Sequence, residues 1–491
     1  MLLLRRILFY FFLALYFTLC PLLMMAALGY SWGARHPQKL IKTGVISFST
    51  MPENATLYLN RKKISQKTPA VLMNLLPGEY TLRAELEGHA AWQGRIQVEA
   101  EKAASIEKVV LVSTAPDADA LTEERVKSFE FLQGHSWVLA RLGSDFKDLQ
   151  LIQLEKGKGS SLALPGTLAR LRDAKVLSVY TVPESRFVLV RVSNGGKGDR
   201  LLKIEIRENP SVSELPVVLS EEPEWLGWDA SQENVLFYQS RGSLYRIDLK
   251  KSLRPERLSE NVRGVGISKG KIFYVTGTAA YRVDVNGGKT RALLADSLLG
   301  QELFDPERTY RIVPSGGGTI FFLNDKGGLF TNRLPYWITK SGVRGVVLDS
   351  RKAQAASWTE TGIMLAEFAS GFMLLEEDFD PAIRSREIFS AGHDIRQVYW
   401  MQAGSHWVYR DGDKAFLMQA SASAKSEPQL LAAVDEEFGI AYDDSTGRLV
   451  YTDPQSGKLM SQRVLPKRDL LSSEILKTGS EIFFEKDKVT P

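Results

Sequence analysis

The stretch "PENATLYLNRKKISQKTPAVLMNLLPGEYTLRAELEGHAAW", Pro52–Trp92, decides the fold of the amino-terminal region. Apolar and polar residues alternate within its short runs, which is the pattern of strands with one buried face. The strictest alternation is that of Tyr80, Leu82, Ala84 and Leu86. A polar hairpin beginning at Asn60 and the turn-forming pair Pro77-Gly78 separate the runs. The stretch therefore predicts short strands joined by tight turns.

Strands of the same kind flank this stretch on both sides. Before it, "TGVISFST" places Ile46 and Phe48 on one face. After it, "GRIQVEAEKAASIEKVVLV" supplies two further strands. We therefore expect a small β-sandwich over residues 44–112.

The order of turn residues within this sandwich resembles that of a PEGA domain. The residues that carry the resemblance are Pro52-Glu53-Asn54-Ala55, Thr68-Pro69, Leu76-Pro77-Gly78-Glu79-Tyr80 and Glu87-Gly88-His89. Asn54 stands where the family has glycine, and asparagine tolerates a left-handed backbone better than most residues. The resemblance implies an interaction or spacer module of prokaryotic envelope proteins, and it brings no catalytic residues with it.

One long apolar run precedes the sandwich. Ile7–Leu28 contains no charged residue, and a helix of about 22 residues rises about 33 Å, enough to cross a hydrocarbon core. Arg5 and Arg6 give this run the basic flank of a signal sequence or a signal anchor. Because the run is longer than a secretory signal, we expect residues 1–34 to be a retained transmembrane anchor. Cleavage at "ALG", Ala27–Gly29, is the alternative.

The orientation of the anchor follows from its flanks. Arg35, Lys39 and Lys42 come after the span, so the positive charges on its two sides are nearly balanced. A very short amino-terminal tail is expected to stay in the cytoplasm. We therefore predict a single-pass protein of the cytoplasmic membrane with the bulk of the chain extracytoplasmic.

The long remainder of the chain repeats short hairpin units. Eight such units lie beyond the polar segment 113–125, which we interpret as a linker; "PESRFVLVRV", "ISKGKIFYVTG" and "DDSTGRLVYTD" are examples. Their spacing of roughly 35 to 52 residues is the period of a four-stranded propeller blade. The units "WDASQENVLFY" and "DDSTGRLVY" resemble the repeats of TolB-type and WD40-like propellers. The expected fold is all-β: a transmembrane helix, a PEGA-like sandwich, and a seven- or eight-bladed β-propeller over 126–491.

A closed propeller needs its two ends to meet. Glu481–Val489 reads as a strand at the carboxyl end, and Val126–Gln133 reads as a similar strand at the start of the repeats. We expect these two segments to complete one blade together, because pairing of the chain ends is a common way to close such a ring.

Composition limits the possible partners. The 62 Lys and Arg residues against 58 Asp and Glu give a net charge of +4, and both signs are interspersed, so nucleic acid is not an expected partner. The single cysteine, Cys20, lies in the apolar run, so the rest of the chain forms no disulfide and no cysteine metal site.

No pattern of catalytic or metal-binding residues stands out. The five histidines have no ligand spacing: they are His36, His89, His135, His393 and His406. Adjacent acidic residues are better explained by turns than by acid and base catalysis: they are Glu376-Glu377-Asp378, Glu436-Glu437 and Asp443-Asp444. The sequence therefore predicts no catalytic residue, no cofactor and no metal site.

Aromatic residues leave one further possibility open. Pairs of them could line a carbohydrate or peptide groove, although packing between blades explains them better: they are Trp225 and Trp228, Tyr336 and Trp337, and Tyr399 and Trp400. His89 with Trp92 could likewise form a patch or simply pack.

We interpret the protein as a noncatalytic envelope scaffold whose propeller binds an unknown protein or glycan. Fold alone does not establish this. The alternatives are a hydrolase or lyase with its site in the central channel of the propeller, and a structural component of a surface layer.

Overall fold

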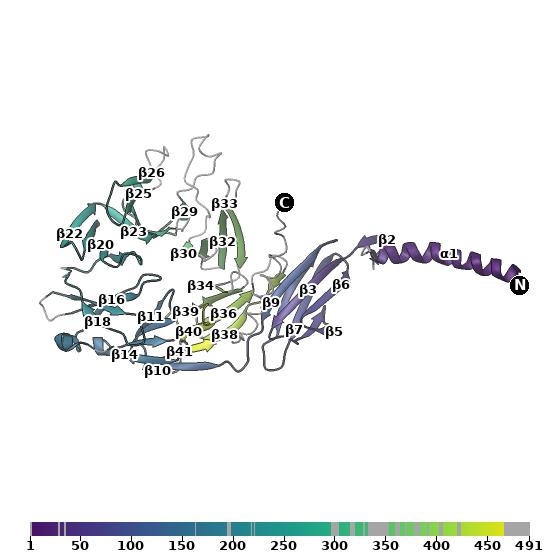
Figure 1. Ribbon diagram of the computed structural model, residues 1–491, viewed down its shortest axis with the longest axis horizontal. Helices are drawn as coiled ribbons and strands as arrows, with labels where there is room; N and C mark the ends of the chain where they lie inside the picture. The colour runs from purple at the N-terminus through teal and green to yellow at the C-terminus, as the bar shows by residue number, and fades with distance from the viewer. Residues whose placement is uncertain are drawn as a thin grey trace, which may run out of the picture.

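The computed structural model shows an all-β protein with one apolar amino-terminal helix (Figure 1). It describes residues 2–27, 30–33, 36–162, 164–193, 198–217, 219, 221–295, 304–314, 320–327, 329–331, 353–358, 364–368, 371–377, 383–389, 392–401, 406–419 and 424–465.

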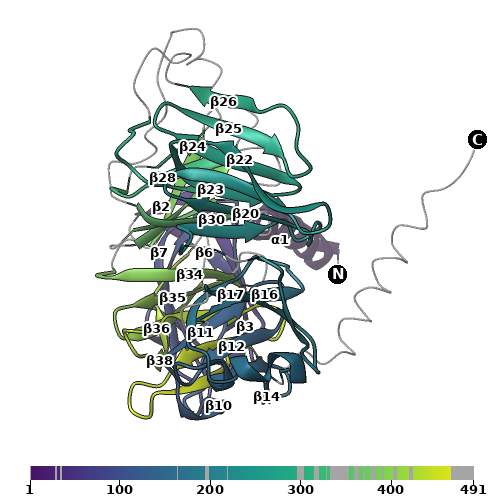
Figure 2. The ribbon, with the colours of Figure 1, turned by 90° about the vertical axis from the view of Figure 1, so that its left-hand side faces the viewer.

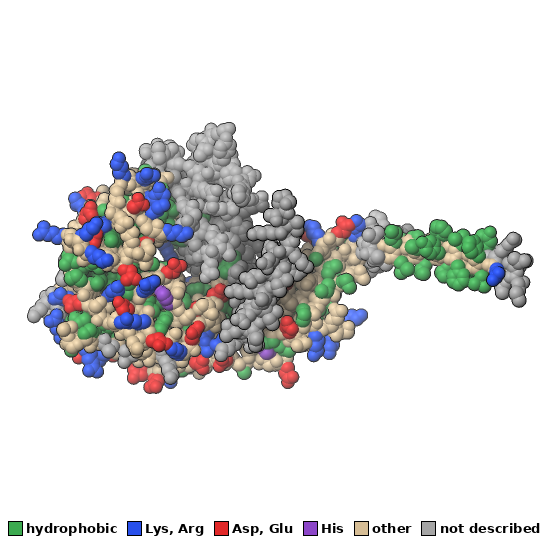
Figure 3. Space-filling view, in the orientation of Figure 1, with side chains coloured by type: hydrophobic (Ala, Val, Ile, Leu, Met, Phe, Trp, Pro, Cys, Tyr) green, Lys and Arg blue, Asp and Glu red, His purple; other side chains and the backbone are tan. Residues whose placement is uncertain are grey.

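Helix α1 (Leu2–Ala27) extends away from the body of the protein (Figure 1). Its segment Ile7–Met25 has a mean hydropathy of 2.2, and none of it is buried. Figure 3 shows the apolar side chains of this helix standing free of the rest of the chain. By length and composition, α1 could therefore cross a membrane. The short strands β1 (Tyr30–Gly33) and β2 (His36–Lys42) follow it and pair with each other.

The predicted sandwich is present and consists of two packed sheets. One sheet has the order β6-β3-β9, and the other continues β5-β4-β7-β8. The strands are β3 (Gly44–Met51), β4 (Thr56–Leu59), β5 (Lys62–Lys67), β6 (Ala70–Leu75), β7 (Gly78–Glu85), β8 (Trp92–Val98) and β9 (Ala103–Val110).

The core of the sandwich uses the apolar faces that the alternation predicts. Ile46, Phe48, Leu82 and Ala84 are fully buried in one cluster, and Tyr80 and Leu86 pack at its edge. Trp92 is buried in the same cluster, with its ring 5.1 Å from that of Phe48. Trp92 is therefore a core residue and forms no surface patch with His89, which is half-buried.

The turns of the sandwich follow the expected chemistry. Asn54 has a φ of +68°, so it adopts the left-handed conformation in place of the glycine of the resembled family. Asn60 and Arg61 both have positive φ, which matches the right-handed twist of the two strands they connect.

Beyond the sandwich, the described chain forms eight small antiparallel sheets. In the first four, the strands are β11 (Ser128–Leu132), β12 (Trp137–Arg141), β13 (Leu149–Gln153) and β14 (Lys158–Ser161); β15 (Val176–Tyr180), β16 (Phe187–Val192), β17 (Arg200–Glu205) and β18 (Val212–Glu214); β19 (Trp225–Trp228), β20 (Val235–Ser240), β21 (Ser243–Asp248) and β22 (Ser252–Ser259); β23 (Val262–Ser268), β24 (Lys271–Thr276), β25 (Ala279–Asp284) and β26 (Arg291–Ala295). Short 3-10 helices lie at Phe146–Asp148 and Gly166–Leu171.

The other four sheets complete the set. Their strands are β27 (Tyr310–Pro314), β28 (Ile320–Asn324) and β29 (Leu329–Thr331); β30 (Ala353–Trp358), β31 (Met364–Phe368), β32 (Gly371–Glu377) and β33 (Ile383–Phe389); β34 (Ile395–Met401), β35 (His406–Asp411), β36 (Lys414–Gln419) and β38 (Gln429–Ala433); β39 (Ile440–Asp443), β40 (Arg448–Thr452) and β41 (Lys458–Arg463), joined by β10 (Ala118–Arg125).

These sheets stack face to face around a ring, which is the architecture of a β-propeller (Figures 1 and 2). Most of the buried clusters in the propeller are shared by neighbouring sheets: one joins β16 to β19, for example, through Phe187 and Trp228, whose rings stack 4.6 Å apart. A sheet that is apolar on both faces must have a neighbour on each side, and the ring provides both. The propeller prediction is confirmed, while the number of blades in the ring stays a prediction.

The described ring closes through a strand that sequence analysis assigned to a linker. Residues 118–125 form β10, which pairs antiparallel with β41 so that Asp119 lies opposite Ser461. The segment around Val126 belongs instead to the next sheet, where β11 pairs with β12. Closure by the chain start is therefore observed, but with different residues. Glu481–Val489, the other half of the expected latch, lies outside the described residues. The domain boundaries themselves stay a prediction.

The sandwich and the propeller share a continuous interface. Strand β37 (Ala424–Ser426) leaves the propeller and pairs with the edge strand β8 of the sandwich. The amide of Gln429 donates to the carbonyl of Val110 (2.8 Å) and accepts from the backbone of Val112 (3.3 Å). Val110 and Val112 also share an apolar cluster with propeller residues. The two units therefore hold a fixed arrangement.

Candidate binding site in the propeller channel

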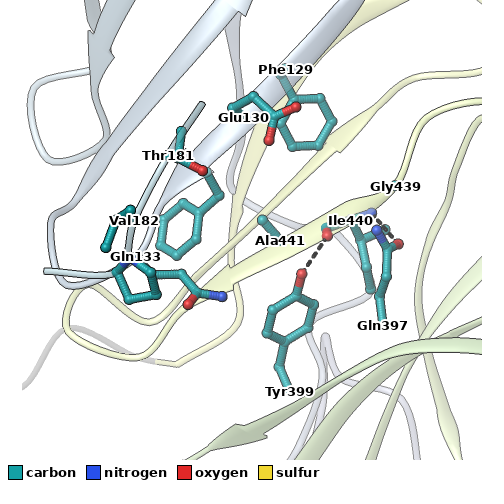
Figure 4. Close-up of a pocket in the computed structure, with 12 residues that line it drawn as sticks. Phe129, Glu130, Gln133, Thr181, Val182, Gln397, Tyr399, Gly439, Ile440 and Ala441 are labelled. Carbon is teal, nitrogen blue, oxygen red and sulfur yellow. Dashed lines mark hydrogen bonds between the residues drawn. The ribbon is translucent and has the colours of Figure 1, made fainter. Parts of the chain in front are cut away.

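A cavity of about 380 Å³ lies where four sheets present their inner edges to one another (Figure 4). Its walls come from β11, from the turn after β15, from β34 and from the start of β39. Strands β11, β15, β34 and β39 are each an edge strand of their sheet, and in all four sheets they form the same, inner edge. The cavity is therefore part of the central channel of the propeller.

One wall of the cavity is built by a β-bulge. The pairing of β34 with β35 shifts register between Arg396 and Tyr399, and Gln397 inside the bulge has a φ of +53°. A bulge turns a side chain away from its regular face. The Gln397 amide oxygen thereby accepts a hydrogen bond from the backbone N–H of Ile440 (2.8 Å), and the Tyr399 hydroxyl donates to the Ile440 carbonyl (2.8 Å).

Gly439 makes this arrangement possible. A Cβ atom at this position would overlap the amide group of Gln397, so glycine leaves the space that the Gln397 side chain occupies. The two backbone groups of Ile440 are satisfied across the two sheets as a result.

Gly439→Ala is expected to lower the free energy of unfolding by about 2 kcal/mol, because it displaces Gln397 and breaks the hydrogen bond from Ile440. Urea unfolding of the full chain followed by tryptophan fluorescence measures the change. Gly166→Ala is the matched control, since a Cβ at Gly166 meets no atom within 4 Å. Equal midpoints for the two variants would contradict the role assigned to Gly439.

The opposite wall carries a lone carboxyl group. Figure 4 shows Glu130 facing the cavity across from Tyr399 and Gln397. The Glu130 side chain is exposed to the space of the cavity. The channel walls around it nevertheless exclude much of the surrounding water, and this desolvation of the carboxylate raises the pKa of Glu130. In the part of the chain that the structure describes, no residue forms an ion pair with it.

Neutral hydrogen-bonding groups complete the lining. Gln133 and Thr181 lie on the same side as Glu130, and Phe129, Phe131 and Val182 supply apolar surface. The cavity thus offers amide, hydroxyl and carboxyl groups, and its accessible lining is mainly polar, which suits a ligand that forms hydrogen bonds.

The histidines considered from the sequence do not meet. His406 is buried at the junction with the sandwich, His89 is half-buried, His393 is exposed, and His135 lies in a turn after β11. The side chain of His36 lies outside the described part. Among the described residues no group of His, Cys, Asp and Glu could hold a metal ion.

The acidic pairs that the structure describes belong to turns. Asp443 accepts hydrogen bonds from the side chains of Ser445 and Thr446 (both 2.7 Å) and so shapes its own hairpin. Glu437 donates its backbone N–H to Asp435 (3.0 Å) in another turn. The side chains of Glu376, Glu377 and Asp378 lie outside the description.

Most of the aromatic pairs pack between or within sheets. Trp228 is buried, and its indole N–H donates to Ser185 (2.8 Å). Trp400 meets Trp407 edge to face at 4.2 Å. Trp225 packs at the edge of an apolar cluster. Tyr399 is the exception, because it lines the cavity. Tyr336 and Trp337 lie outside the described residues.

Three lining residues, Glu130, Gln133 and Gln397, were not predicted from the sequence. The one local signal for Glu130 was its place in "FEF", Phe129–Phe131, where a carboxyl group stands between two aromatic residues of a strand and points to the face opposite theirs. Gln397 had no local signal, because its position depends on contact with Gly439.

Comparison with known proteins agrees with this architecture. Residues 43–112 match the family model of the PEGA domain. The resemblance seen in the turn residues is thereby confirmed, and the sandwich is called the PEGA domain from here on. Curated proteins gave no match to the chain.

Among solved structures, several propellers are similar to the chain. The β-propeller domain of Cps50 (Swd1) from Myceliophteria thermophila is 12% identical, with a TM-score of 0.37 over 59% of this chain and 99% of that chain. Hsv2 from Kluyveromyces lactis is 12% identical, with a TM-score of 0.40 over 63% and 98%. Virginiamycin B lyase from Staphylococcus aureus is 12% identical, with a TM-score of 0.35 over 56% and 91%. Similarity of this degree says nothing about what the chain binds.

Proposed function

We propose that the protein is a noncatalytic, membrane-anchored envelope scaffold whose propeller holds a protein or glycan partner at the channel cavity. The observation that carries the proposal is the lining of this cavity. Gln133, Thr181 and Glu130 face Gln397 and Tyr399 across a space large enough for a peptide or sugar segment. A mainly polar lining with several hydrogen-bonding groups suits such ligands.

The junction with the PEGA domain supports a scaffold role. Pairing of β37 with β8 fixes the propeller relative to the segment that leads to α1. If α1 spans the cytoplasmic membrane with the short basic tail inside, the propeller is held on the extracytoplasmic side at a set distance from the bilayer. A rigid support presents a binding site without the entropy cost of ordering a linker.

A photo-reactive amino acid at Gln133 tests the proposal in intact cells. We expect a discrete crosslinked species whose partner is identified by mass spectrometry, because a ligand in the cavity must pass close to this side chain. The matched control carries the same amino acid at Leu253, an exposed residue of the outer strand β22. Binding in the channel would be refuted if the amino acid at Gln133 gave no crosslinked species. It would also be refuted if the positions Gln133 and Leu253 gave the same crosslinked species.

A second function is favoured by one specific observation. The pKa of Glu130 is raised by burial, and a carboxyl group of this kind can serve as a general acid in a hydrolase or lyase. If the captured ligand is cleaved by the wild type, Glu130→Gln should slow the cleavage by on the order of a hundredfold or more. If the wild type and the Glu130→Gln variant both yield the same intact ligand, the result would favour the noncatalytic scaffold function.

A further inference from the structure

One end of the PEGA domain receives the chain from α1. Strand β3 begins there at Gly44, and its pairing with β6 sets Gly44 opposite Leu75. At the same level, β7 begins with Gly78 opposite Val98 of β8. Val45 donates its backbone N–H to the Lys102 carbonyl (3.1 Å), which adds the turn before β9. We call these turns the anchor-proximal end.

The anchor-proximal end exposes apolar side chains. Met73 on β6 is 67% exposed and points outward, since Leu72 beside it enters the core. Leu75 and Leu76 are half-buried, and Pro77 is exposed. Met73, Leu75 and Leu76 thus place neighbouring apolar side chains at this end of the domain, a surface suited to contact with lipid or protein.

A basic hairpin borders the same end. Its residues Arg61, Lys62 and Lys63 are all exposed. Asn60 holds the hairpin beside the start of β7 by accepting the Thr81 N–H at its side chain (2.9 Å) and donating its own N–H to the Thr81 carbonyl (2.8 Å). The three cations therefore flank the apolar surface.

The ion pairs of the described part of the chain do not include these three cations. Within the described residues, none of the three forms an ion pair, whereas Lys42 at the same end pairs with Glu101, and Lys102 pairs with Glu99 at 2.6 Å. The domain thus neutralises some of its anchor-proximal lysines and leaves the hairpin cations for an external anion.

We propose that the anchor-proximal end docks on the surface of the bilayer that holds α1, with Arg61, Lys62 and Lys63 on anionic lipid headgroups and Met73 at the boundary of the acyl chains. This inference rests on the membrane anchor of the proposed function. A basic rim around an apolar tip matches the charge and the polarity gradient of an anionic lipid interface. The anchor holds this surface next to the bilayer, so docking requires no further search.

An environment-sensitive fluorophore at Met73 tests this docking. The full chain carries Cys20→Ser, which removes the single native cysteine, together with Met73→Cys for labelling. It is reconstituted into vesicles of phosphatidylglycerol and phosphatidylcholine, or of phosphatidylcholine alone. We expect emission at shorter wavelength in the anionic vesicles, and loss of this shift in the triple variant Arg61→Glu, Lys62→Glu, Lys63→Glu.

Two controls separate docking from other effects. The same label at Leu253→Cys is expected to show no shift, and reversal of two exposed propeller lysines, Lys250→Glu and Lys251→Glu, should leave the Met73→Cys shift intact. Emission that is the same in both lipids, or unchanged by the triple reversal, would overturn the docking. Flotation of the vesicles is the independent readout for the anchor: protein that fails to float with them refutes the anchor, whereas floating protein without the shift refutes docking alone.

Discussion

Leu121→Ala is expected to lower the free energy of unfolding by about 3 kcal/mol, one of the largest effects of a single truncation in this chain. Leu121 lies on β10 and is only 6% exposed. It packs in a cluster that joins β40 and β41 to β12 and β13, across the point where the ring closes. The cavity left by the lost methyl groups would loosen the closing strand as well as the core.

Leu253→Ala is the matched control for this variant. Leu253 is also a leucine on an outer strand, but it is 46% exposed, so its truncation should change stability by less than about 0.5 kcal/mol. Urea unfolding of both variants in mild detergent, followed by tryptophan fluorescence, makes the comparison. If both leucines behave alike, β10 does not close the ring in the way that its pairing with β41 indicates.

Strand β10, which closes the ring, could not be recognised from the sequence for a physical reason. Only Leu121 and Thr122 of β10 are buried, and the other residues of the strand are largely exposed. An outermost strand with so little buried surface has the composition of a linker. Its partner lies more than three hundred residues away, at Ser461 opposite Asp119. No local pattern can report such a pairing.

The architecture was predictable where burial imposes a period. Alternation in β7 fixed one face of the PEGA domain, and Leu82 and Ala84 are indeed fully buried. Repeated hairpins indicated the propeller because each sheet has the same need for two neighbours. Packing of Trp228 and Trp400 also followed the general expectation for large aromatic side chains.

The channel cavity was not predictable, because it depends on distant contacts. The bulge at Gln397 is stabilised by Ile440 and permitted by Gly439, so its sequence signal is divided between two sheets. Glu130 differs from the many other acidic residues only in its place within the ring. Sites that are assembled from inner strands need the fold before they can be seen.

Acid is expected to weaken the protein through His406, which is 1% exposed at the junction with the PEGA domain. Burial lowers the pKa of His406 from 6.5 to about 4. Above pH 6.5 the imidazole is neutral in both the folded and the unfolded chain. Between pH 6.5 and about 4 the unfolded chain binds a proton that the folded protein excludes, so stability falls as the pH falls. The gap between the two pKa values corresponds to about 3 kcal/mol.

The geometry of the junction gives the same sign. The Nε2 atom of His406 accepts the backbone N–H of Val110 (3.4 Å), and a protonated imidazole has no lone pair for this bond. Urea unfolding at several pH values should therefore show that the stability difference between the wild type and His406→Gln changes by about 3 kcal/mol from pH 7 to pH 4, with the wild type losing more. His393→Gln, at a side chain that is 93% exposed, should keep the wild-type pH dependence. A His406→Gln variant as acid-sensitive as the wild type would show that other groups carry the effect.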